Sequence, residues 1–348
     1  MRSMARHIGV IGAVLLVLVL AVPAKAQVIL RDAEMERSLR ELARPVIAAA
    51  GLSPNRIRVI VLKDSRLNAF VLDGQRIFIN SGLLLKMKRP EMLQAVLAHE
   101  LAHIANGHFT RRATNARAAR NTALLGLLLS AAGLAGGTSC ASQRAGVGDT
   151  RAEESAADQS AVRYMAAANI DPSGLVEVME IFAGQEILSR NRQDPYARTH
   201  PMSRDRLRRL KGFAAAYKEA LPTDPAAAYW FARVREKLSA YVSKPSYTLR
   251  RMRKDNSDAS RVARAMAFHK NSKTNMALAE IDALLTRRPK DAYAHEFRGQ
   301  ILLESRNFGA SVNSYKRAAA LAPKEPLILA GYGRALLAAG QPKSALGV

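Results

Sequence analysis

The segment HELAH at residues 99–103 restricts the structure of this chain more than any other part of its sequence. Two histidines four residues apart lie on one face of an α-helix, so the imidazoles of His99 and His103 can reach one metal ion. Glu100 follows the first histidine, which places its carboxylate beside a metal-bound water rather than on the metal. Short motifs of this kind also arise by chance, but here a proline opens a helical pattern over residues 90–107. The sequence therefore predicts a helix that carries two Zn²⁺ ligands, His99 and His103, and a general base, Glu100.

A zinc site of this kind needs a further protein ligand, and the sequence offers several candidates. Glu154 and Asp158 are four residues apart in a helical pattern, so one can bind the metal while the other orients a ligand histidine through its ring N–H. Glu153 is an alternative ligand, but Asp158 lies off its face. His108 lies five residues after His103 and off the ligand face, which favours a helix-end or supporting role. We therefore predict Glu154 as the third ligand and Asp158 as the residue that orients a histidine.

Before the motif the sequence predicts a helix and a small sheet. An amphipathic pattern covers residues 33–50, and residues 57–62 (IRVIVL) are rich in β-branched side chains. The stretches 68–72 and 76–80 flank an Asp-Gly pair, which is a strong hairpin signal. Further helical patterns occupy residues 151–168, 173–190, 204–220 and 226–242. The predicted fold class is α+β: a mainly helical, zincin-type metalloprotease domain with a small β-sheet, followed by an α-helical solenoid.

The solenoid is predicted from a period of 34 residues near the C-terminus. Small residues and prolines recur at this distance in three pairs, Pro289 and Pro323, Gly299 and Gly333, and Ser311 and Ala345. This period, with Tyr315 as an aromatic residue in a second helix, indicates tetratricopeptide (TPR) repeats; an ordinary array of helical hairpins is the alternative. The predicted domains are a signal peptide at 1–26, a zinc metalloprotease domain at 27–242, a basic linker at 243–260, and about two and a half TPR repeats at 261–348, the last one incomplete.

The pattern of a secretory signal peptide covers residues 1–26. Arg2 and Arg6 open it, a 15-residue apolar run follows, and residues 24–26 form a small-x-small cleavage site. An uncleaved membrane anchor is the alternative, but the run is shorter than the ~20 residues that span a bilayer. We therefore expect an exported protein.

The formal net charge of +24 arises from 53 lysines and arginines against 29 acidic residues. Such a charge indicates a polyanionic partner, but export and an aromatic content of 5% argue against nucleic acid. The excess is denser near the C-terminus, where residues 243–348 carry 19 basic and eight acidic side chains. We expect it to serve docking to an anionic envelope partner or membrane surface. The single cysteine, Cys140, excludes an intramolecular disulfide and a multi-cysteine metal site, and indicates an incidental free thiol.

An insert at residues 121–137 is rich in alanine, leucine and glycine but too short to span a bilayer. It is either a helix that is buried against the domain or lids its cleft, or a mobile segment that touches membrane or substrate. It separates the HELAH segment from the helix predicted to carry Glu154, so it affects how open the cleft is.

Several segments together resemble a known family. HELAHIANGH at 99–108, EESAAD at 153–158, and Thr-His-Pro at 199–201 with Arg206 are similar to the zinc metallopeptidases of the HtpX and CAAX-prenyl-protease superfamily, of gluzincin type. The secretory signal, the RDAEME and NAF segments and the C-terminal repeats resemble its periplasmic BepA-like branch. The resemblance implies a zinc endopeptidase with one Zn²⁺ per chain.

This resemblance also assigns roles to residues. It implies that His99, His103 and Glu154 are the ligands and that Glu100 is the general base. It further implies that His200 and Arg206 approach the site, where His200 caps the open position of the metal or stabilises the oxyanion.

The implied function is that of a periplasmic zinc-dependent endopeptidase that hydrolyses misfolded or misassembled envelope proteins in outer-membrane protein quality control. Asn68, Ala69 and Phe70 are expected in an edge strand on which an extended substrate pairs by backbone hydrogen bonds, although Phe70 could simply belong to the core. The repeats are expected to dock substrates or the outer-membrane assembly machinery. The alternative is a TPR-based chaperone or adaptor of outer-membrane assembly with a latent protease site. Membrane-embedded prenyl-type processing is disfavoured because the sequence has no second predicted span.

Overall fold

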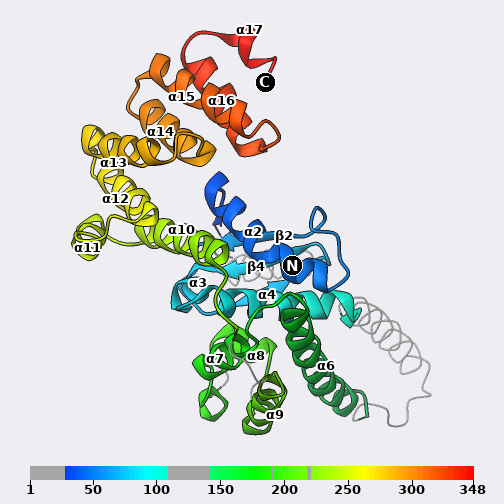
Figure 1. Cartoon of the computed structure of the whole chain (residues 1–348). Helices are drawn as coiled ribbons and strands as arrows, with labels where there is room; N and C mark the ends of the chain where they lie inside the picture. The colour runs from blue at the N-terminus through cyan, green and yellow to red at the C-terminus, as the bar shows by residue number, and fades with distance from the viewer. Residues whose placement is uncertain (1–27, 109–140, 190, 202, 218–220) are drawn as a thin grey trace, which may run out of the picture.

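The computed structural model describes residues 28–108, 141–189, 191–201, 203–217 and 221–348, which are mostly helical with one small sheet (Figure 1). The predicted signal peptide, the apolar insert and Cys140 lie outside these residues. Within the described ranges, no helix is both long enough and apolar enough to cross a membrane. The predicted α+β fold class is confirmed.

Four strands form a mixed sheet in the order β1-β2-β4-β3. Their bounds are β1 Ile29–Leu30, β2 Arg58–Leu62, β3 Ala69–Val71 and β4 Arg76–Asn80. β2 and β4 run parallel, whereas β1 pairs antiparallel with β2 and β3 pairs antiparallel with β4. The predicted hairpin is confirmed, and Gly74 in its turn has φ 75°, a conformation that favours glycine. β3 therefore forms one edge of the sheet.

The helix predicted around the HELAH segment is confirmed as α4 (Pro90–Ala105), at the centre of the first domain (Figure 1). It contacts β3 and packs mainly against three helices, α2 (Ala33–Ala49), α6 (Ala141–Ala167) and α7 (Ser173–Ile181). A proline at its first position loses no hydrogen bond, and Gly107 with φ 68° follows its end. Every α4 residue from 90 to 103 is buried. α4 is therefore an inner helix, covered on all sides.

Two helices are shorter than their sequence patterns predicted. α7 ends at residue 181 instead of 190, because Gly184 has φ 84° and leaves the helical region. A 3-10 turn and the short helix α8 (Pro195–Thr199) follow, and α9 (Arg204–Ala215) ends before the predicted residue 220. The chain after α7 therefore turns back towards α4 instead of continuing away from it.

The helix α10 (Pro225–Val242) belongs to both halves of the molecule. Its Phe231, Val234 and Leu238 pack in the core that contains the sheet and α4, whereas Ala240 packs in the core of the helices that follow. The predicted domain boundary at residue 242 therefore falls at the end of a helix that both halves share.

The segment 243–260, predicted to be a linker from its basic composition, differs from that expectation. It contains helix α11 (Pro245–Arg251), which packs against α12 (Asp258–Lys270). The helix forms because a proline stands at its first position and two arginines in its last turn interact favourably with the helix dipole. The connection between the halves is therefore a packed helix.

Consecutive helices then pack on one another (Figure 1). They are α13 (Thr274–Arg287), α14 (Ala292–Glu304), α15 (Phe308–Leu321), α16 (Pro326–Ala338) and α17 (Pro342–Ala345). Tyr315 lies between two glycines: a Cβ on Gly299 or on Gly331 would come within 2.7 Å or 2.4 Å of its ring. Gly333, which the period pairs with Gly299, has open space beside it instead. These helices pack as consecutive hairpins, which is the arrangement that the 34-residue period predicts. Their identification as TPR repeats stays a prediction.

A buried cluster of charged side chains joins the two halves. Arg233 of α10 is fully buried, forms an ion pair with Glu34 of α2, and contacts Asp291 before α14 at 2.8 Å. Lys237, one turn along α10, lies 3.1 Å from Glu34 and 2.8 Å from Asp32. Burial would raise the pKa of Glu34, but Arg233 and Lys237 lower it. Both cations therefore keep Glu34 ionised inside the junction.

One further acid faces this cluster. Burial raises the pKa of Glu296 on α14 to about 8, although Lys237 opposes the shift. The other charged groups that act on Glu296 are Asp32, Glu34 and Arg334.

Candidate active site

Four side chains that can ligate a metal meet beside α4. One ligand atom from each of His99, His103, Glu154 and His200 lies within 4.8 Å of the other three, and all four residues are buried. The Nε2 atoms of His99 and His103 are 3.1 Å apart, which the four-residue spacing on α4 makes possible. Glu154 on α6 reaches the same point because α6 packs along α4. Among the described residues, this is the group of histidines and acids that could hold a metal ion.

The carboxylate of Glu154 faces all three imidazoles. Its Oε2 lies 3.4 Å from Nε2 of His99, its Oε1 lies 3.5 Å from Nε2 of His103, and its Oε2 lies 3.0 Å from Nδ1 of His200. Glu153, the rival ligand from the sequence, is buried but does not belong to the group. The structure therefore brings together the three predicted ligands and adds His200 as a fourth donor.

Asp158 and Arg206 lie behind the cluster. An oxygen of Asp158 lies 3.1 Å from Nδ1 of His99, on the side of the ring away from the other donors. Arg206 donates to both oxygens of Asp158, from Nε at 2.7 Å and from Nη2 at 2.9 Å. Its Nη1 also lies 3.2 Å from Glu154. This arrangement holds the His99 ring and one carboxylate of the cluster in fixed positions.

Glu100 lies next to His99 on α4 and is almost fully buried. Its Oε1 is 3.4 Å from Nε2 of His200. It does not belong to the four-donor group, so the structure places this carboxylate beside the cluster, where the motif predicts it.

His200 enters the cluster from the segment that follows α8. Its backbone N–H donates to the carbonyl of Tyr196 at 2.8 Å, and the two rings pack with their centroids 4.5 Å apart. Tyr196 also stacks on Phe182 at the end of α7, at 4.8 Å. Tyr196 was not predicted from the sequence, although its position one helical turn before His200 is a signal that could have identified it. Tyr196 positions His200.

His108 also supports the cluster. Its Nδ1 lies 3.0 Å from Nδ1 of His103, so it contacts the ring on the side away from the other donors. This is the supporting position that the sequence favoured over a ligand role.

The charges of the site suit a bound cation. Burial alone would lower the pKa of His99, but Asp158 and Glu154 raise it to about 9. Burial, with the positive charge of His99, lowers the pKa of His103 to about 2. Burial would raise the pKa values of Glu154 and Asp158, yet the histidines and an arginine hold both below their ordinary range. One ionised carboxylate within the donor group and a second one behind His99 thus make this position attractive to positive charge, and the donor set of imidazoles and a carboxylate fits a metal ion such as zinc.

The edge strand β3 contacts α4, the helix that carries His99 and His103. The main chain of Asn68 accepts a hydrogen bond from Asn80 at 2.9 Å, and Phe70 pairs with Phe78 in the register of the sheet. In an antiparallel pair these positions direct their main-chain groups to the partner strand, so those of Ala69 and Val71 point away from β4. Ala69 is fully buried, whereas Val71 is half-buried. Phe70 is half-buried and its ring stacks on Phe78, with centroids 5.3 Å apart.

Comparisons with known proteins agree with this geometry. The chain is 28% identical over 219 residues to the "Putative beta-barrel assembly-enhancing protease" of Vibrio cholerae, covering 60% of this chain and 45% of that protein. It is 31% identical over 171 residues to the "Mitochondrial metalloendopeptidase OMA1" of Schizosaccharomyces pombe, covering 48% and 49%. It is 22% identical over 337 residues to the "Beta-barrel assembly-enhancing protease" of Escherichia coli, covering 92% and 68%. The chain thus spans about half the length of the first two relatives.

A family model, peptidase family M48, matches residues 30–214. This range includes β2, β3, β4 and α4, the four donors of the cluster, and both residues behind it. Because the match covers more than half of the chain, the chain belongs to peptidase family M48.

Proposed function

We propose that this chain is a zinc-dependent endopeptidase in which His99, His103 and Glu154 hold Zn²⁺ and Glu100 is the general base. The observation that carries the proposal is the buried group of donors on α4 and α6 with the Glu100 carboxylate beside it. When bound, zinc would act as a Lewis acid and lower the pKa of a bound water. Imidazole nitrogens with one carboxylate are a donor set typical of catalytic zinc.

The protein's own groups would then orient the reaction and move the proton. Asp158 would accept the Nδ1–H of His99, which fixes the ring with Nε2 towards the metal position, and Arg206 would hold Asp158 in its ionised form. A carboxylate oxygen of Glu100 would accept the proton of the attacking water and deliver it to the nitrogen of the leaving peptide.

For His200 we favour the capping role over oxyanion stabilisation. Its Nδ1 lies 3.3 Å from Nε2 of His99 and 3.0 Å from Glu154, inside the donor group rather than beside it. Four protein donors are typical of closed zinc sites, whereas catalytic sites keep one position open. We expect His200→Ala to keep stoichiometric metal and to raise the rate of peptide cleavage; a rate that falls to background would assign His200 to the reaction instead.

The substrates we propose are unfolded or misassembled envelope proteins in the periplasm. β3 is an edge strand whose half-buried Val71 turns its main-chain groups away from β4, and an extended polypeptide that pairs there would be bound with little dependence on its sequence. Two relatives are named beta-barrel assembly-enhancing proteases, which supports a role in outer-membrane assembly quality control. The predicted signal peptide supports export, and the C-terminal helical hairpins, as TPR repeats, would bind substrate or assembly machinery.

A chaperone or adaptor with a latent protease site is the second candidate. The position of His200 within the donor group favours it, because a closed site is inactive until the cap moves.

The deciding experiment compares the parent chain with Glu100→Gln, and with Glu180→Gln on the exposed surface as a matched control. Cleavage of an unfolded outer-membrane protein is followed by gel electrophoresis, and zinc is measured by mass spectrometry. We expect Glu100→Gln to retain zinc and to lose about 10²–10⁴-fold in rate. We expect His103→Ala to lose the metal and Glu180→Gln to behave as the parent. Equal cleavage by Glu100→Gln and the parent would refute the peptidase assignment, and full rescue of a deletion strain by Glu100→Gln would favour the adaptor.

A further inference from the structure

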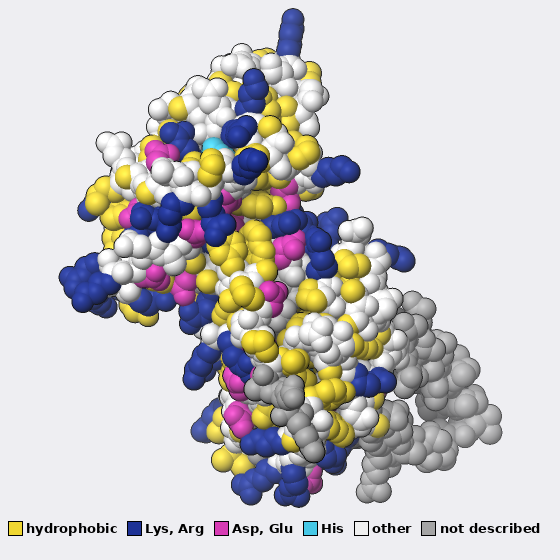
Figure 2. Space-filling view, in the orientation of Figure 1, with side chains coloured by type: hydrophobic (Ala, Val, Ile, Leu, Met, Phe, Trp, Pro, Cys, Tyr) yellow, Lys and Arg dark blue, Asp and Glu magenta, His cyan; other side chains and the backbone are white. Residues whose placement is uncertain are grey.

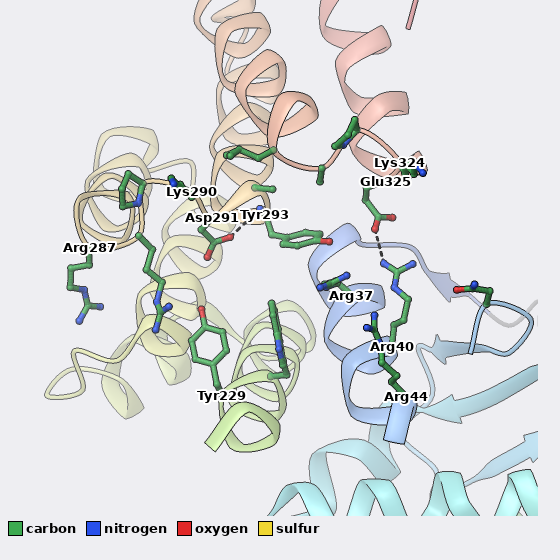
Figure 3. A pocket seen from close by; sticks show the side chains of 18 residues that line it. Arg37, Arg40, Arg44, Tyr229, Arg287, Lys290, Asp291, Tyr293, Lys324 and Glu325 are labelled. Atoms are coloured by element: carbon green, nitrogen blue, oxygen red, sulfur yellow. Dashed lines mark hydrogen bonds and ion pairs between the residues drawn. The ribbon is translucent and has the colours of Figure 1, made fainter. Parts of the chain in front are cut away.

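A cleft of about 870 Å³ opens where the helical hairpins meet the peptidase domain (Figure 3). No residue of the donor cluster lines it. Its volume is near the upper end of the ~300–1,000 Å³ typical of ligand sites. One wall is α2, the other is formed by the loops before α14 and α16, and α10 contributes Tyr229 and Trp230. The cleft therefore exists only because the two halves are packed together.

Basic side chains line both walls. They are Arg37, Arg40 and Arg44 on α2, Arg287 at the end of α13, and Arg288, Lys290 and Lys324 on the facing loops. Figure 2 shows lysine and arginine side chains on both sides of the junction between the halves. Two acids, Asp291 and Glu325, also line the cleft. The walls therefore carry a large excess of positive charge.

This charge is only partly neutralised within the protein. Arg37 and Arg44 share Glu41, at 2.9 Å and 3.0 Å, and Arg287 and Arg288 share Asp258. Asp291 is engaged by Arg233 and by the first turn of α14.

The two lysines of the cleft add to the unmet charge. Lys290 and Lys324 are exposed and form no ion pair among the residues that the structure describes. An anionic ligand would supply the missing partners.

One ion pair across the cleft shows that the arginines of α2 can bind a carboxylate. Glu325, at the start of α16, reaches over to α2 and its Oε2 lies 2.6 Å from Nη2 of Arg40 (Figure 3). Glu325 is buried, whereas the Arg40 side chain is 40% exposed. A carboxylate of the chain itself thus occupies the middle of the arginine row, with Arg37 and Arg44 on either side of it. A carboxylate from another molecule would fit the same row.

The spacing of the arginines suits an extended chain. Residues 37, 40 and 44 lie on one face of α2, and seven residues of helix rise about 10 Å. An extended polypeptide rises about 3.3 Å per residue, so about three residues cover this row. The aromatic rings provide apolar contact beside the charges: the guanidinium of Arg288 lies 4.7 Å from the Tyr229 ring, and that of Arg37 lies 5.9 Å from the Trp230 ring. A compact phosphate would need donors that converge on one point, whereas these are spread along both walls.

We propose that this cleft binds an extended acidic segment of a partner polypeptide, with its carboxylates on the α2 arginines and on Lys290 and Lys324. This binding site is separate from the proposed peptidase reaction and does not depend on it. The cleft would then be the binding site for the anionic partner that the net charge predicts.

The test measures the fluorescence anisotropy of a short labelled peptide of alternating glutamate and glycine, titrated with the full chain at low ionic strength. The same peptide with glutamine is the uncharged control. We expect the glutamate peptide to bind, the glutamine peptide not to bind, and salt to weaken the complex. The double variant Lys290→Glu/Lys324→Glu should bind about tenfold more weakly, because two exposed ion pairs are lost. Both lysines are exposed, so the variant keeps the fold, which circular dichroism checks.

Two controls separate this site from general attraction to a basic protein. Lys273→Glu/Lys343→Glu makes the same charge change at exposed positions outside the cleft and should leave binding unchanged. Glu325→Gln removes the internal carboxylate and should strengthen binding several-fold, whereas Glu304→Gln on exposed α14 surface should not. Equal weakening by both lysine pairs would overturn the proposal. Binding of phosphatidylglycerol vesicles or inorganic phosphate, but not of the glutamate peptide, would also overturn it and would assign the cleft to a phosphate group.

Discussion

Replacement of Arg233 by methionine should separate the two halves of this molecule more effectively than any other single change at their junction. Arg233 is buried in α10, and its guanidinium contacts Glu34 of α2 and Asp291 before α14, so one side chain ties together three elements. Methionine keeps much of the aliphatic volume but provides no charge. Glu34 has no exposed surface, and its one remaining ion pair would be with Lys237 at 3.1 Å. Lys237 also forms an ion pair with Asp32.

The expected cost follows from this arrangement. Removing one partner of a buried ion pair costs about 3–5 kcal/mol, because the other charge is left buried and poorly compensated. Lys237 remains to face Glu34, so we expect the lower end of this range, about 3 kcal/mol. Replacing both partners, in Glu34→Gln/Arg233→Met, should recover most of the loss because no uncompensated charge remains.

The chain has a built-in probe for this measurement. Its single tryptophan, Trp230, lies on α10 one helical turn before the buried arginine and lines the cleft at the junction. Urea denaturation followed by tryptophan fluorescence therefore reports on the junction, and circular dichroism reports on the helices. Fluorescence that changes at lower urea than circular dichroism would indicate that the halves part before they unfold.

The matched control is Arg235→Met on the same helix. Its side chain is 30% exposed, pairs with Glu236 and donates from Nε to the main-chain carbonyl of Met87 at 3.1 Å, so its loss should cost about 1–2 kcal/mol. A loss for Arg233→Met no larger than that for Arg235→Met would refute the view that buried charges hold the halves together.

Three further outcomes are expected. Because burial raises the pKa of Glu296 to about 8, this carboxyl stabilises the fold below pH 4.5 and loses that contribution as the pH rises through 8. The free energy of unfolding of the parent, relative to Glu296→Gln, should therefore fall by about 3 kcal/mol between pH 5 and pH 8, measured by urea denaturation at each pH; a constant difference would contradict this. Gly331→Ala should cost about 1–3 kcal/mol because its Cβ would lie 2.4 Å from a tyrosine ring, whereas Gly333→Ala, with open space beside it, should be neutral or stabilising in thermal unfolding. Asp158→Asn should weaken zinc binding about 10–100-fold in a chelator competition, since the residue orients His99; unchanged affinity would remove it from the site.

The sequence predicted those parts of the fold and site that depend on local spacing. The four-residue interval between His99 and His103 and that between Glu154 and Asp158 define helix faces, so their side chains could be placed before any packing was known. The hairpin turn and the start of α4 likewise follow from single residues, a glycine and a proline, with fixed backbone preferences. These predictions needed no information about which elements pack together.

Features that depend on contacts between distant segments could not be predicted in this way. Tyr196 reaches His200 and Phe182 only because the chain turns back after α7. Arg233 and Glu34 are 199 residues apart, and no local pattern marks either as buried. The basic composition of residues 243–260 indicated a linker, because composition records charge but not the contacts that make α11 a packed helix.

The two faces of α2 connect the proposed binding site to the proposed peptidase site. One face carries the arginine row of the cleft, and the other packs against α4, where Gln94 donates to the main-chain carbonyl of Leu42 at 3.2 Å. Because α2 is held on both sides, by this core and by the buried charges of α10, it is rigid support rather than a moving part. A polypeptide bound in the cleft would therefore act by tethering: it raises the effective concentration of the rest of its chain around the domain that carries β3 and the donor cluster. An acidic segment fused to a substrate should then lower KM and leave kcat unchanged, whereas a change in kcat would require that binding alters the catalytic residues themselves.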